Sequence, residues 1–188
     1  MVTLDQSHNI HQVLEQFDMN NAKGLSAPLE VSQSGGVPGE DIDFDDKVYK
    51  RAIGCLLYLS GVTRPDIAFT VSKLSRMCSK PRLCDWRDVQ HVFRYLRKIS
   101  DLKLCYYKTD SQVKVFWDAD FANDKVDPHS CSGYVILLAG RAVSWCSKRQ
   151  GVVAQSTVEA DFLSNGRGHE GDSKDERSIG RARSDTIH

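Results

Sequence analysis

The chain has 188 residues, 40% of them hydrophobic, which is enough for a packed core in part of the chain and excludes a fully disordered protein. Its net charge is zero, but the charges are unevenly distributed: residues 1–48 carry nine acidic and two basic side chains, whereas residues 64–114 carry twelve basic and five acidic ones. Only the middle of the chain therefore suits a partner that carries phosphate groups. No apolar run approaches the roughly 18 residues that span a bilayer, and the N-terminus lacks the pattern of a secretory signal, so we expect a cytoplasmic or nuclear protein that is not secreted and has no membrane partner.

The first predicted element is a helix over residues 8–19. Ile10, Val13, Leu14 and Phe17 recur at spacings of three and four, which gives one apolar helical stripe. Residues 27–46 are rich in proline, glycine, serine and acid and show no periodicity. We expect this stretch to be a mobile loop.

Two further helices are predicted between residues 49 and 81. In the first, Ile53, Leu56, Leu57 and Leu59 suit a buried helix, and Gly61 is a typical end. The second is expected to begin with Thr63 as a hydroxyl cap and Pro65 in its first turn, and to stop near Pro81.

Residues 85–99 predict an amphipathic helix with one apolar and one basic side. Its apolar stripe consists of Val89, Val92, Phe93, Leu96 and Ile99. Its basic side chains are Arg87, Arg94, Arg97 and Lys98. Two interpretations stay open, because a basic helix face is often simply solvated but can also bind the phosphates of nucleic acid.

After Ser100 the apolar period changes from helical to alternating. Four short runs, at residues 102–108, 113–120, 132–140 and 141–148, predict an antiparallel meander, and a helix is expected to begin near Ser156. Residues 165–188 are too polar to offset their ordering entropy, and we expect them to be disordered. The fold class is therefore predicted to be α+β.

Acidic and sulfur-containing residues are the candidates for chemistry. Asp118, Asp120 and Asp124 lie at the end of a predicted strand and in the loop beyond it, where carboxylates can hold a hard cation or simply be solvated. The six cysteines form no CxxC pair and lie in apolar or strand-like runs, so reduced, packed thiols are expected rather than disulfides or a zinc site.

A wider pattern points to a known family. The motifs TRPDIAFTVS, DAD, SGYV, SW-x-SK-x-Q and STVEA occur in this order, and about residues 3–164 closely resemble the Pol polyprotein of copia-type LTR retrotransposons. The resemblance implies the end of the reverse transcriptase over residues 1–48, with an acidic linker. It further implies a helical segment like the thumb and connection over residues 49–100, and an incomplete ribonuclease H-like sheet over residues 101–164.

In this family, ribonuclease H cuts the RNA strand of an RNA–DNA hybrid with two Mg²⁺ ions held by four carboxylates. The resemblance maps the first carboxylate onto Asp118 and the second onto Asp161, where the family usually has glutamate. Glu159 cannot replace Asp161, because residues two apart on a helix point in nearly opposite directions. The resemblance therefore makes Mg²⁺ the expected cofactor.

Other motifs of the family are missing from the 188 residues. After Ser164 there is no strand with the family's DNQSA-like motif, and no YVDD-like polymerase motif occurs. We therefore expect a Pol fragment without a complete polymerase or nuclease site, which is catalytically inactive. The alternatives are a salt-dependent binder of RNA or RNA–DNA hybrid and a residual Mg²⁺-dependent nuclease. An exposed sheet edge also predicts self-association.

Overall fold

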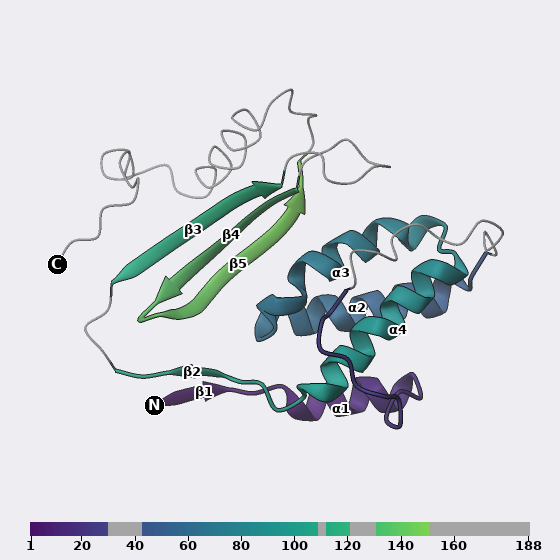
Figure 1. Cartoon of the computed structure of the whole chain (residues 1–188), viewed down its shortest axis with the longest axis horizontal. Coiled ribbons are helices and arrows are strands. Elements are labelled where there is room, and N and C mark those ends of the chain that lie inside the picture. Colours follow the sequence, from purple (N-terminus) through teal and green to yellow (C-terminus); the bar gives the residue numbers. More distant parts are fainter. Residues whose placement is uncertain (30–42, 109–111, 121–130, 151–188) are drawn as a thin grey trace.

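The computed structural model describes residues 1–29, 43–108, 112–120 and 131–150, with the backbone alone for residues 119 and 120. Within these ranges the chain has four α-helices and two small antiparallel sheets, so the predicted α+β class is confirmed. Figure 1 shows the helices gathered on one side of the larger sheet, with the N-terminal strand β1 below it. The predicted loop, the helix near Ser156 and the C-terminal tail fall largely or wholly outside the described residues.

The helices enclose the hydrophobic core. They are α1 (Ser7–Gln16), α2 (Asp46–Val62), α3 (Ala68–Ser75) and α4 (Leu83–Lys98), and 3₁₀ turns at Pro65–Ile67 and Arg76–Ser79 flank α3. Amphipathic stripes explain their packing, because each buries its apolar face against the others. The core side chains are Ile10, Leu14, Met19, Tyr49, Ala52, Ile53, Leu56, Leu59, Ile67, Val71, Leu74, Val89, Val92, Phe93 and Leu96.

Local side-chain contacts set two helix starts. Asp45 caps α2, since its carboxylate accepts a hydrogen bond from the backbone N–H of Lys47 at 2.9 Å. Asp85 closes a capping box at the start of α4 by accepting from the backbone N–H of Arg82 at 2.8 Å. Both carboxylates also lie near the positive end of a helix dipole.

The predicted boundary between the second and third helices was wrong in detail. Helix α2 continues through Gly61 to Val62, and Thr63 follows it as the C-cap. The Thr63 hydroxyl does not cap the next helix but donates to Gln6 Oε1 at 2.6 Å, where both side chains are buried. A buried hydroxyl must find a partner, and this distant acceptor was invisible to local sequence reasoning.

The predicted burial of Leu57 was also wrong. Its side chain is 48% exposed, whereas its neighbour Leu56 is fully buried. Successive helical residues point about 100° apart, so Leu57 falls outside the stripe that faces the core. Leu57 thus lies on the outer face of α2.

The strands form two sheets instead of one meander. β3 (Val113–Asp120), β4 (Cys131–Leu138) and β5 (Arg141–Arg149) pair in that order, as the sequence predicts. β2 (Leu104–Tyr106) does not join them but pairs with β1 (Val2–Leu4) at the N-terminus. The ion pair between Lys103 and Asp5, at 2.6 Å, supports this long-range pairing.

Polar contacts tie the larger sheet to its surroundings. The indole N–H of Trp145 on β5 donates to the Ser60 carbonyl of α2 at 2.7 Å. The Tyr106 hydroxyl donates to the Ala142 carbonyl at 2.6 Å, which holds β2 near β5. On the helical side, Arg76 Nη2 lies 2.9 Å from Cys131 Sγ. All six cysteines are free thiols of intermediate burial.

Candidate functional site

Asp118 lies on β3 beside a cleft between the sheet and the start of α3. It pairs across the strand with Gly133 and shares a face with Phe116, because side chains two apart on a strand point the same way. The cleft has a volume of about 340 Å³, and Pro65 and Phe69 line its helical wall. Asp118 is exposed, so its carboxylate is accessible from this cleft.

The described residues do not by themselves fit a pair of Mg²⁺ ions. Asp161, the second predicted ligand, lies outside them, and Asp120 is described by its backbone alone. Within the described ranges, no three histidine, cysteine, aspartate or glutamate side chains come together in a way that could hold a metal ion. A two-metal centre needs several carboxylates, and here Asp118 supplies one.

Three of the four predicted nucleic-acid contacts hold another segment of the chain. On α4, the side chains of Arg94, Arg97 and Lys98 donate hydrogen bonds to residues of the 20–26 segment. The acceptors are the Lys23 carbonyl, the Asn20 carbonyl and the Ser26 hydroxyl. The fourth predicted residue, Arg87, is exposed near the other end of α4. Part of the basic face of α4 therefore binds another segment of the same chain.

Gly24 allows the 20–26 segment to lie close against α4. A Cβ atom at this position would stand 2.9 Å from Lys98 Cβ and 3.4 Å from Lys98 Cα. Real Cβ atoms essentially never come closer than 3.0 Å to another such atom, so a side chain at position 24 would force this segment or α4 to shift. The glycine and the basic side chains together fix this segment on the helix.

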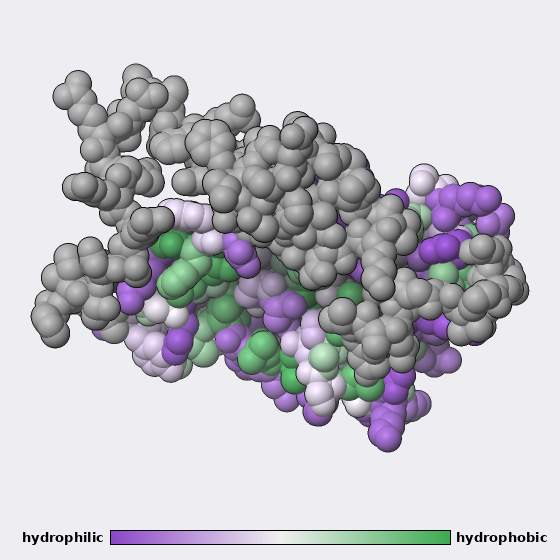
Figure 2. All heavy atoms as spheres, turned by 45° about the horizontal axis from the view of Figure 1, so that its top comes forward, coloured by the Kyte–Doolittle hydropathy of each residue, from purple (hydrophilic) through white to green (hydrophobic). Residues whose placement is uncertain are grey.

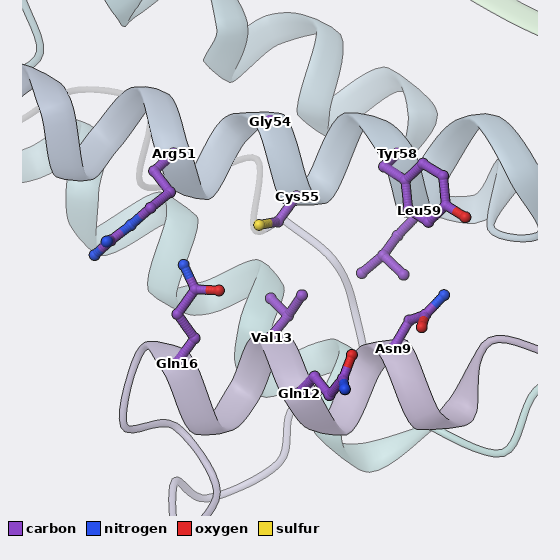
Figure 3. Close-up of a pocket in the computed structure, with 9 residues that line it drawn as sticks. All are labelled: Asn9, Gln12, Val13, Gln16, Arg51, Gly54, Cys55, Tyr58 and Leu59. Atoms are coloured by element: carbon purple, nitrogen blue, oxygen red, sulfur yellow. The ribbon is translucent and has the colours of Figure 1, made fainter.

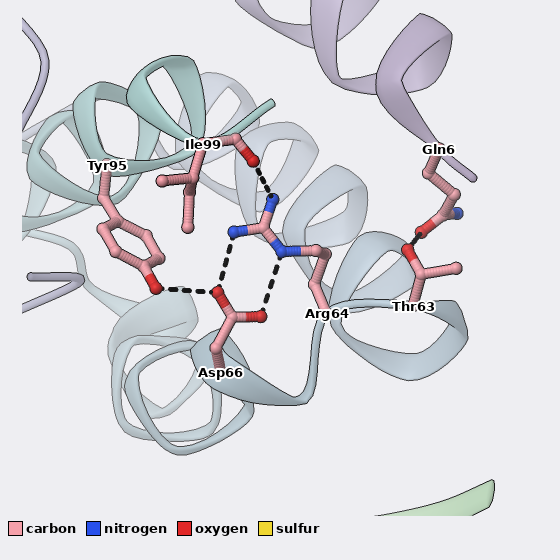
Figure 4. A network of polar contacts seen from close by, with 6 residues as sticks. All are labelled: Gln6, Thr63, Arg64, Asp66, Tyr95 and Ile99. Atoms are coloured by element: carbon pink, nitrogen blue, oxygen red, sulfur yellow. Dashed lines mark hydrogen bonds and ion pairs between the residues drawn. The ribbon is translucent and has the colours of Figure 1, made fainter. Parts of the chain in front are cut away.

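Sequence reasoning missed a buried polar network at the turn between α2 and α3. The Arg64 side chain is fully buried and makes two hydrogen bonds to Asp66 and one to the Ile99 carbonyl (Figure 4). The Tyr95 hydroxyl donates to Asp66 at 2.9 Å, and the Arg64 guanidinium carbon lies 5.8 Å from the Tyr95 ring centroid. The only sequence signal was the Arg-Pro-Asp order, which does not reveal the partners on α4.

A second cavity, of about 520 Å³, is a groove between α1 and α2. Figure 3 shows Asn9, Gln12 and Gln16 along α1, facing Arg51 and other residues of α2 across the groove. Burial raises the pKa of the Cys55 thiol in its wall, so the neutral thiol is favoured over the reactive thiolate. The groove is thus a hydrogen-bonding surface without an activated nucleophile among these residues.

Comparison with known proteins finds relatives along most of the chain. It is 37% identical over 166 residues to the Retrovirus-related Pol polyprotein from transposon TNT 1-94 of Nicotiana tabacum, and the match covers 85% of this chain. It is 30% identical over 162 residues to the Pol polyprotein from transposon RE2 of Arabidopsis thaliana, which covers 86% of this chain. The chain belongs to the Pol polyproteins of copia-type retrotransposons.

The chain spans a small share of these polyproteins, 12% of the tobacco one and 11% of the Arabidopsis one. It is also 38% identical over 116 residues to the Secreted RxLR effector protein 161 of Plasmopara viticola, which covers 61% of this chain and 82% of that protein. No family model and no solved structure matches the chain. None of the described helices is long and apolar enough to cross a bilayer.

Proposed function

We propose that this Pol segment runs from the end of a reverse transcriptase into the start of a ribonuclease H domain, and that it does not cleave RNA by itself. In this proposal the four helices correspond to the thumb and connection region. The sheet of β3, β4 and β5 corresponds to the first strands of the ribonuclease H fold. The segment would act in the cytoplasm or nucleus as part of a Pol assembly.

The position of Asp118 carries this proposal. It lies on the first strand of a three-stranded antiparallel sheet and faces a cleft, as expected for the first family carboxylate. Among the described residues, no three histidine, cysteine, aspartate or glutamate side chains come together in a way that could hold a metal ion. Residues 165–188 also lack the family's next carboxylate motif. Cleavage of an RNA–DNA hybrid tests the proposal, with no metal-dependent product as the expected result.

Binding of RNA or an RNA–DNA hybrid is a second proposed function, which the excess of basic residues between positions 64 and 114 favours. Arg94, Arg97 and Lys98 already hold the 20–26 segment, so we expect them to contribute less than their number suggests. Arg87 is the fourth residue predicted to contact phosphates, and its side chain is exposed. The measurement is hybrid affinity against salt concentration for the parent chain and Arg87→Ala, and affinity independent of salt would contradict this proposal.

A residual nuclease built on Asp118, Asp161 and Mg²⁺ is the competing possibility. It requires that residues beyond Gln150 bring Asp161 to the cleft and that a further ligand joins them. Hybrid cleavage that depends on Mg²⁺ and on both aspartates would support it over the inactive segment. Hybrid binding without cleavage would instead support the binding proposal.

A further inference from the structure

The outer edge of β3 differs from the rest of the larger sheet. Among the described residues, β4 is the only strand that pairs with β3, whereas β5 has β2 near its other side. All six residues from Val113 to Asp118 are exposed, and Phe116 and Trp117 are 56% and 40% exposed. A long, exposed, apolar edge strand is a template for pairing with another chain.

Apolar residues also continue from this edge onto one face of the sheet. Val113, Val115 and Trp117 share that face, and register places them opposite Leu138, Ile136 and Tyr134 on β4. In Figure 2, hydrophobic residues gather on the left of the molecule, where the sheet lies in Figure 1. A partner that extends the sheet at β3 would therefore also extend an apolar surface.

The sequence of β3 is complementary to itself in the antiparallel direction. If two copies pair about a twofold axis at Phe116, Lys114 of each copy faces Asp118 of the other. Val115 faces Trp117 in the same way, and the two Phe116 side chains meet at the axis. Opposite charges and aromatic or β-branched pairs at directly opposed positions stabilise antiparallel strands.

We propose that β3 is a dimerisation edge whose partner is a second copy of this chain, paired antiparallel about Phe116. Twofold symmetry makes the contact isologous, so it closes at two copies and does not propagate into a fibre. The two Lys114–Asp118 pairs fix the register, because a one-residue shift would bring the apolar and charged faces of the two strands out of line. This pairing does not depend on nucleic-acid binding or on cleavage.

Sedimentation of the full chain over a range of concentrations tests the proposal. We expect a monomer–dimer equilibrium that Lys114→Glu and Asp118→Lys each weaken about tenfold, because each places like charges opposite one another. The double variant Lys114→Glu/Asp118→Lys restores opposite charges and should return to within about threefold of the parent chain. Lys108→Glu changes an exposed lysine outside β3 and should leave the equilibrium unchanged.

Circular dichroism and thermal unfolding establish that each variant is folded, which is expected because Lys114 and Asp118 are exposed. A chain that stays monomeric at all concentrations would overturn the proposal, as would single charge reversals without effect. Rescue of Lys114→Glu by Asp120→Lys in place of Asp118→Lys would overturn the register, because it would centre the pairing on Trp117. Rescue by Asp118→Lys alone supports the pairing about Phe116.

Discussion

Arg64 and Asp66 form a two-point ion pair in which the arginine is completely enclosed. Arg64 Nη2 lies 2.7 Å from Asp66 Oδ2, and Arg64 Nε lies 3.0 Å from Asp66 Oδ1. The arginine side chain has no exposed surface, whereas that of Asp66 is 25% exposed. The same guanidinium donates to the Ile99 carbonyl at the end of α4, so this pair joins the α2–α3 turn to α4.

Replacing Arg64 with leucine should strongly destabilise the protein. The substitution leaves the Asp66 carboxylate without its cationic partner and removes one of the donors to the Ile99 carbonyl. Breaking a buried ion pair from one side typically costs about 3 kcal/mol or more of unfolding free energy. Lys50→Ala is the control, because it removes an exposed ion pair with Asp46 and should change stability little. Denaturant unfolding measures both, and equal effects of the two variants would contradict the assigned role of Arg64.

Replacing either of two glycines with alanine should change stability, in opposite directions. At Gly24 the added methyl group would collide with Lys98, and overpacking of this kind costs roughly 1–3 kcal/mol. At Gly54, on the exposed face of α2, the methyl group meets nothing within 4 Å, and alanine should stabilise the helix by roughly 0.5–1 kcal/mol. Thermal unfolding of Gly24→Ala and Gly54→Ala tests this contrast. A stabilised Gly24→Ala would show that the 20–26 segment does not lie close against α4.

Asp88 should lower stability at neutral pH. Burial, and next the charge of Asp85, raise the pKa of Asp88 above its ordinary value of 3.8. The folded state then binds the proton of Asp88 more tightly than the unfolded state does. The protein therefore loses stability as pH rises from 3.8 through the raised pKa. Asp88→Asn should therefore raise the melting temperature at pH 7, and the difference should disappear below the ordinary pKa.

Asp5 should have the opposite effect on stability at neutral pH. The hydrogen bond from Lys103 is the main cause that lowers the pKa of Asp5 to about 2. Its stabilising contribution is therefore present above the ordinary value of 3.8 and is lost as pH falls toward 2. Asp5→Asn should lower the melting temperature at pH 7 but not at the acid end of this window. The same shift for Asp5→Asn and Asp88→Asn at pH 7 would contradict the assignment of both groups.

Sequence reasoning predicted the elements whose signals are local. The stripe from Val89 to Leu96 defined α4, and alternation defined β3, β4 and β5, because both periods follow from backbone geometry. Pairing of β2 with β1 was missed, since it joins residues about a hundred positions apart and has no local signature. The partners of Thr63 and Arg64 were missed for the same reason.

The candidate site was predicted only where a motif marks it. The family motif around Asp118 identified that residue, and the structure places it at a cleft between the sheet and α3. The basic residues of α4 were predicted as phosphate contacts because their charge is visible in the sequence. Their bonds to the 20–26 segment were not visible, because they depend on how that segment folds back over α4.

Cleavage of a labelled RNA–DNA hybrid tests the central claim most directly. The parent chain, Asp118→Asn and the exposed control Asp101→Asn would be compared with Mg²⁺, with Mn²⁺ and with a chelator, after each is shown to be folded. We expect no cut product above the buffer background from any of the three proteins under any condition. Metal-dependent cutting by the parent chain and Asp101→Asn that is lost in Asp118→Asn would contradict the claim that the segment is inactive by itself.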